Sequence, residues 1–114
     1  MAWTERQVEA WIEKELKKLG YLYYKFVSPG NSGVPDRIMV SPHGNVTFVE
    51  LKTKIGKLSE VQNVQISRIE HHGASVVIVY GEAGAKQFIE MVRGIERVYN
   101  KTGNSIYLGR SVFR

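Results

Sequence analysis

The sequence predicts an α/β domain in which helices flank a mixed β-sheet. Apolar residues recur at helical spacing in three segments, and aromatic or β-branched segments bounded by turn formers predict strands. One continuous apolar run between glycines predicts a strand covered on both faces. The expected order is α-β-β-β-α-β-α. Because a helix joins the third and fourth strands, we expect these two strands to be parallel.

The first helix is expected to begin at Thr4, which can form a capping box with Gln7, and to end at Gly20. Apolar residues between these ends share one face. The helix therefore packs this face against the sheet.

The acids of this helix differ in their expected surroundings. Glu9 and Glu13 fall outside the apolar arc and are expected to be solvated, whereas Glu15 lies inside it as a partly buried structural acid. Glu5 also lies inside the arc, in the first turn. It either interacts with the helix dipole or reaches a metal site, and the sequence leaves both open.

Three strands follow the first helix. Residues 21–27 (YLYYKFV) form the first strand, and the turn formers of 28–35 form a loop. Residues 36–40 and 46–52 are expected to pair as a hairpin through the five-residue connection 41–45.

A basic loop over 53–58 leads into the second helix. Ser59 and Gln62 match a second capping box, and the helix is expected to run to His72. Because it joins the third strand to the fourth, we expect a right-handed crossover that places this helix on a face of the sheet.

The last elements are a buried strand over 74–80 and a helix from about Ala83. We expect the globular domain to span residues 1–96. Residues 97–114 form a mostly polar tail of unknown role, which could add a short strand or act as a dimer arm.

Composition narrows the function classes. The 114 residues contain no cysteine, which excludes a disulfide framework, a thiolate zinc site and a cysteine nucleophile. A net charge of +5 is compatible with a polyanionic partner. No apolar run approaches the roughly 20 residues that span a bilayer, and no signal peptide is evident. A cytoplasmic location without a membrane partner is therefore expected.

Two acids and a lysine lie on the predicted hairpin. Glu50 and Lys52 are two residues apart on one strand, so their side chains share a face, and Asp36 begins the neighbouring strand. Mg²⁺ or Mn²⁺ could bind Asp36, Glu50 and the carbonyl of Leu51, with Lys52 beside the phosphate or the attacking water. Alternatively these are ordinary surface and turn residues, but their combination favours phosphodiester hydrolysis.

At these positions the sequence resembles the PD-(D/E)xK nuclease superfamily, through Pro35–Asp36 and Glu50-Leu51-Lys52. More narrowly, GVPDRI and FVELKTKIGKLSEVQ resemble the virus-type replication-repair nuclease (VRR-NUC) domain, in its standalone phage-like form, over residues 4–96. The resemblance implies a restriction-endonuclease-like fold. The tail has no counterpart in the family.

The resemblance also implies roles for five residues. Asp36 and Glu50 would be metal ligands and Lys52 the catalytic lysine. Gln62 would position the lysine and the substrate, and Glu5 would approach the metal directly or through water. From the residues alone, Gln62 could instead serve only to complete the capping box with Ser59, although it is expected to point towards the sheet.

Polar and basic residues around this edge predict a DNA track that contacts the backbone and recognises shape, because nothing suggests base-specific contacts. The candidate DNA-binding residues are Lys25, Ser28, Asn31, Ser32, Arg37, Lys54, Lys57 and Ser59.

The function expected from these features is a Mg²⁺-dependent, structure-selective DNA endonuclease. The resemblance implies a Holliday-junction resolvase that acts as a homodimer, with Trp3, residues 21–24 and the tail as candidate interface. The alternative is a non-cleaving DNA-binding module of a larger replication or repair assembly. RNA as the substrate also stays open.

Overall fold

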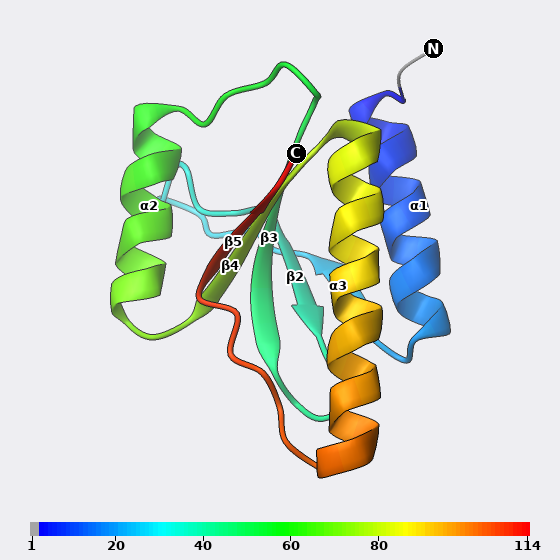
Figure 1. Ribbon diagram of the computed structural model, residues 1–114. Coiled ribbons are helices and arrows are strands. Elements are labelled where there is room, and N and C mark those ends of the chain that lie inside the picture. Colours follow the sequence, from blue (N-terminus) through cyan, green and yellow to red (C-terminus); the bar gives the residue numbers. More distant parts are fainter. Residues whose placement is uncertain (1–2) are drawn as a thin grey trace.

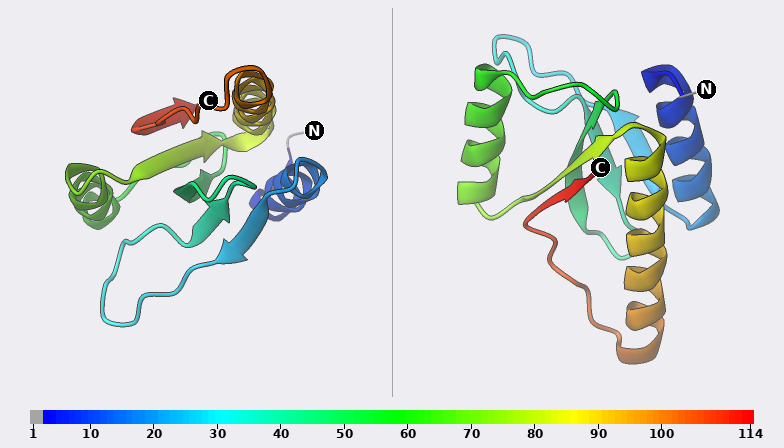
Figure 2. Two further views of the ribbon diagram at one scale, coloured as in Figure 1. Left: turned by 90° about the horizontal axis from the view of Figure 1, so that it is seen from below. Right: turned by 45° about the horizontal axis from the view of Figure 1, so that its top comes forward.

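The computed structural model describes residues 3–114. A five-stranded sheet has the order β1-β2-β3-β4-β5, antiparallel from β1 to β3 and parallel from β3 to β5. Helices α1 and α3 cover one face and α2 covers the other (Figures 1 and 2). The elements in chain order are α1 (Glu5–Lys18), β1 (Leu22–Lys25), β2 (Arg37–Val40), β3 (Val46–Lys52), α2 (Glu60–His71), β4 (Ser75–Tyr80), α3 (Gly81–Thr102) and β5 (Arg110–Phe113).

The predicted α/β class and the mixed sheet are confirmed. Both capping boxes are present: Thr4 and Gln7 at the start of α1, and Ser59 and Gln62 at the start of α2. All six residues of β4 are buried, as the continuous apolar run predicted.

Apolar side chains alternate between two cores, one on each face of the sheet. Val77 and Val79 point towards α1 and α3, whereas Val76, Ile78 and Tyr80 point towards α2. The same alternation along β3 buries Leu51 beneath α1 and α3. It leaves Glu50 and Lys52 on the α2 face, where the candidate site lies.

The C-terminal residues differ from the prediction in where the last helix ends, whereas a short strand was one of the two alternatives for the tail. Helix α3 continues to Thr102, so the predicted domain boundary after residue 96 lies inside a helix. Residues 97–102 contain no glycine or proline, so the helix propagates until Gly103 caps it in a left-handed conformation. The tail then forms β5, which pairs in parallel with β4 of the same chain.

Two other expectations are corrected. The first strand covers Leu22–Lys25 rather than 21–27, because the Tyr21 amide still bonds the Leu16 carbonyl at the end of α1. Among the residues proposed for a dimer interface, Tyr21 is buried in the core, whereas Trp3 is half-buried and packs against its edge; the dimer itself stays a prediction.

None of the helices within residues 3–114 has the length and apolar character needed to cross a membrane.

Candidate active site

Three predicted site residues meet where β3 ends and α2 begins. The Lys52 ammonium lies 3.8 Å from Oε2 of Glu50, and the Gln62 side-chain amide donates to the same oxygen at 3.4 Å. Strand spacing puts Glu50 and Lys52 on one face, and the first turn of α2 carries Gln62 over them.

Glu50 is the buried carboxyl group of this site. Its residue is only 6% exposed, and its pKa is raised from 4.5 to about 7. Burial is the largest cause of this shift. The nearby charges of Asp36 and Glu5 also raise the pKa, while Lys52 and Arg37 lower it. Near neutral pH a large fraction of Glu50 is therefore protonated when no cation is present.

Asp36 and Glu5 lie at the rim of the site. The Asp36 side chain is 62% exposed and directly precedes β2, and Glu5 is exposed in the first turn of α1. Both are close enough to act on the charge of Glu50. The two explanations offered for Glu5, helix dipole and metal site, are thus compatible in this structure.

The donor atoms fit a hard divalent cation bound through few protein ligands. Among residues 3–114, no three histidine or acidic side chains are gathered closely enough to hold an ion by themselves. Mg²⁺ keeps several waters and takes one or two carboxylates, however, and Asp36 and Glu50 provide two. The raised pKa of Glu50 comes first from burial and then from the charge of Asp36, and a bound cation would offset both.

The side-chain amide of Gln62 makes two different contacts, one through its oxygen and one through its nitrogen. Its Oε1 accepts from the Ser59 backbone N–H at 2.9 Å, while its Nε2 faces Glu50. The capping bond and the contact with Glu50 therefore coexist, because opposite atoms of one side chain make them, and the positioning role stays a prediction. The Ser59 hydroxyl accepts from the Gln62 backbone N–H at 3.1 Å.

Arg37 has a structural partner instead of an open surface. Its guanidinium donates to the Glu9 carboxylate through Nε and Nη2, with Nη2 2.7 Å from Oε2, and its Nη1 lies 3.2 Å from the Asp36 carboxylate. The side chain is 11% exposed. This arrangement does not support the predicted contact of Arg37 with DNA, and Glu9, expected to be solvated, is half-buried with a lowered pKa.

Replacing Arg37 by methionine should lower the free energy of unfolding by about 2 kcal/mol, because Glu9 would lose its charged hydrogen-bond partner in a half-buried position. Thermal melts of Arg37→Met and of Arg6→Met, which removes an exposed arginine of α1, measure the difference. Equal melting temperatures, together with weaker DNA binding by Arg37→Met, would restore the DNA-contact interpretation.

The other predicted DNA-binding residues lie on the surface around the site. Lys25, Ser32, Lys54, Lys57 and Ser59 are exposed. In the loop before Asp36, the Asn31 side-chain amide donates to the Ser28 hydroxyl at 2.9 Å, so these two polar groups stabilise the loop itself. A bond from Phe26 N–H to the Asp36 carbonyl closes the loop at its base.

Two neighbours of the site, Glu9 and Tyr23, were not predicted to lie there. Glu9 lies one helical turn after Glu5, and this i, i+4 spacing could have indicated that both acids face the sheet edge. Tyr23 has a buried hydroxyl without a hydrogen-bond partner in the described chain, and burial raises its pKa, with Glu9 adding to the effect. No sequence pattern marks Tyr23, since it is one of several aromatic residues in its strand.

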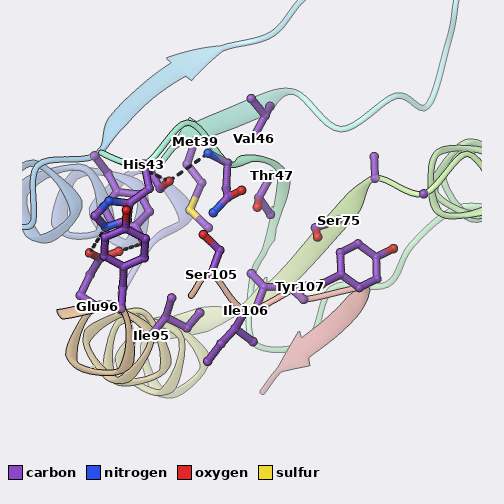
Figure 3. Close-up of a pocket in the computed structure, with 17 residues that line it drawn as sticks. Met39, His43, Val46, Thr47, Ser75, Ile95, Glu96, Ser105, Ile106 and Tyr107 are labelled. Carbon is purple, nitrogen blue, oxygen red and sulfur yellow. Dashed lines mark hydrogen bonds and ion pairs between the residues drawn. The ribbon is translucent and has the colours of Figure 1, made fainter. Parts of the chain in front are cut away.

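A hollow of about 310 Å³ lies at the opposite end of the sheet, between the hairpin turn, α3 and the tail (Figure 3). The Glu96 carboxylate there accepts from the Tyr21 hydroxyl at 2.6 Å and lies 2.7 Å from His43 Nε2. Glu96 is thus engaged in holding the turn against α3. The hollow has no acid–acid–lysine set, so it is not the candidate active site.

Comparisons with known proteins agree with this geometry. The family model for the VRR-NUC domain matches residues 3–83. "Putative nuclease p44" of Acyrthosiphon pisum secondary endosymbiont phage 1 is 37% identical over 75 residues, which cover 66% of this chain and 81% of that protein. A solved structure described as a VRR_NUC domain superposes with a TM-score of 0.68 at 30% identity, covering 78% of this chain and 94% of the other.

Proposed function

Because this chain belongs to the VRR-NUC domain family and is a nuclease domain, we propose that it is a metal-dependent endonuclease that hydrolyses DNA phosphodiester bonds. The observation that carries the proposal is the buried Glu50 carboxyl beside Lys52, with Asp36 at the rim.

Asp36, Glu50 and the Leu51 carbonyl would hold Mg²⁺ or Mn²⁺. When bound, the cation would neutralise the phosphate and lower the pKa of a water molecule. Lys52 orients the attacking water or contacts the phosphate, and it can accept or return a proton there. Gln62 fixes the Glu50 carboxylate and thereby the position of Lys52. Glu5 adds negative charge at the rim, which favours a cation.

We infer a structure-selective action on branched DNA. The cations around the site, such as Lys25, Lys54 and Lys57, suit backbone phosphates, and recognition by shape follows from such contacts. Symmetric cutting of a four-way junction requires two sites, and hence a two-fold homodimer. Leu22 and Tyr24 support such a contact, because they are 49% and 54% exposed on the edge strand β1.

The test compares cleavage of a four-way junction, a linear duplex and a single strand in Mg²⁺, each repeated with EDTA. We expect the junction to be cut fastest, by about tenfold or more if shape contributes at least 1.4 kcal/mol, and EDTA to stop all cutting. The mass of the free protein in solution should be that of a dimer. Equal rates on the three substrates would contradict junction selectivity. Binding without cleavage would indicate the alternative, a DNA-binding module.

A further inference from the structure

A basic cleft lies next to the candidate active site. It is at the end of the molecule where α1 and α3 begin and β5 ends, and Figures 1 and 2 show how these elements meet there. Its volume is about 640 Å³, and its walls include Trp3, Lys54, Tyr80, Lys86 and Arg114. A volume of this size is typical of sites that enclose a ligand group. The cleft is separate from the hollow beside His43.

The sheet connects this cleft directly to the catalytic lysine. Lys52 and Tyr80 are register partners on β3 and β4, and neighbouring strands lie about 4.8 Å apart. The Arg114 guanidinium lies over the Tyr80 ring, 4.3 Å from its centre. A second hollow, of about 400 Å³, is also lined by Tyr80 and Arg114 and includes Lys57. Arg114 thus borders both hollows, and only the Tyr80 side chain separates it from Lys52 of the candidate active site.

The close packing around α3 fixes the walls of the cleft. A side chain at Gly84 would overlap the Phe113 carbonyl, so only glycine lets β5 end against the helix. Gly81 has a positive φ of 62°, and a Cβ there would lie 3.2 Å from the Lys54 side chain. The Gln87 amide holds the Arg114 carbonyl at 3.0 Å. The Gln87 bond thus fixes the backbone of Arg114, and the close approach at Gly81 fixes where the backbone of Lys54 lies.

The charges of the cleft suit an anion. Within residues 3–114, Lys54, Lys57 and Arg114 form no ion pair, while Lys86 pairs with the cleft's acid, Glu82, at 2.9 Å. Lys86 also lies 5.5 Å from the Trp3 ring centre. The cleft therefore has a surplus of positive charge, and two of its cations lie against aromatic rings. Such an arrangement suits the backbone of a nucleic acid.

We propose that Arg114 and Lys86, together with Lys54, bind a backbone phosphate of the DNA strand next to the phosphate that is cut. The inference rests on the proposed nuclease function and deepens it, since it directs the substrate strand across the end of β5. Arg114 and Lys86 lie outside the residues 3–83 that match the family model. Lys86 belongs to α3 and Arg114 directly follows β5, so the proposed contact uses parts of the chain beyond that match. The tail thereby has a role in substrate binding.

The experiment measures binding of a fluorescein-labelled four-way junction in EDTA, by anisotropy, over a series of salt concentrations. Arg114→Ala should weaken binding about fivefold to tenfold and reduce the slope of log affinity against log salt by about one, as expected for one lost phosphate contact. Lys86→Gln should act in the same direction without disturbing β5. Lys101→Ala, an exposed lysine at the far end of α3, is the charge-matched control and should bind like the wild type.

The outcomes separate this inference from the proposed function. If Arg114→Ala and Lys86→Gln both keep the affinity and salt slope of the wild type, the phosphate contact is wrong, even if the wild type cleaves DNA in Mg²⁺. If Arg114→Ala melts at a lower temperature, Lys86→Gln alone decides. If the wild type binds DNA but does not cleave it, the catalytic proposal fails, and the binding comparison still tests the cleft.

Discussion

Lys52→Ala is expected to lower the rate of DNA cleavage about 1000-fold while leaving the fold intact. A positioned proton-transfer or charge-stabilising group contributes about 10²–10⁴-fold to catalysis, and Lys52 is the cation nearest to the buried Glu50. Its side chain is 20% exposed and makes one long ion pair, so its loss should cost little stability. Single-turnover cleavage of a four-way junction in Mg²⁺ measures the effect on the chemical step.

The matched control for Lys52→Ala is Lys101→Ala, which removes the same charge from an exposed position in the last turn of α3. Glu50→Ala should be as inactive as Lys52→Ala, because both residues serve one site. DNA binding by Lys52→Ala should remain within a few-fold of wild type, since the other cations around the cleft persist. Cleavage within threefold of wild type by either active-site variant would show that the chemistry occurs elsewhere.

Local signals made most of the fold predictable. The capping boxes at Thr4 and Ser59 depend on residues three positions apart, and the buried run of β4 depends on one uninterrupted segment. Such patterns are set by neighbours in sequence, so they can be read without knowing the tertiary structure. The α/β class and the mixed sheet follow from their order.

The C-terminal strand was less predictable, because its stability depends on contacts with distant residues. Residues 110–113 have few apolar side chains, and half of those in β5 are exposed. They form a strand because β4 offers an unpaired edge and Gly84 lets the backbone of α3 come close. Neither condition is visible within the segment itself.

The candidate site also has a part that was predictable from the sequence and a part that was not. Glu50, Lys52 and Gln62 meet as predicted, because strand alternation and the start of α2 fix their directions. The Arg37–Glu9 pair was missed, since it joins a strand to a helix 28 residues earlier. In the sequence both look like exposed charged residues, and only the tertiary contact between α1 and β2 shows that they neutralise each other.

Glu50→Gln is expected to stabilise the metal-free protein by about 3 kcal/mol at pH 8, an upper estimate for a group whose pKa moves from 4.5 to about 7. Between these two values the folded state holds more protons at Glu50 than the unfolded state does. The contribution of Glu50 to the free energy of unfolding therefore falls as the pH rises from about 4.5 to about 7, and it is constant at higher pH. Glutamine carries no charge to bury, so it removes this dependence.

Urea unfolding in EDTA at several values between pH 5 and pH 8 measures the difference between wild type and Glu50→Gln. Taking the difference cancels the other groups, such as Glu9, whose lowered pKa favours the folded state above its titration range. The two proteins should be about equally stable near pH 5 and diverge towards pH 8. Addition of Mg²⁺ at pH 8 should then stabilise the wild type more than the variant, because binding at the charged carboxylate offsets its burial. A difference that does not change with pH would mean that the Glu50 carboxylate is already well solvated or paired, and the argument for a cation at this position would lose its electrostatic basis.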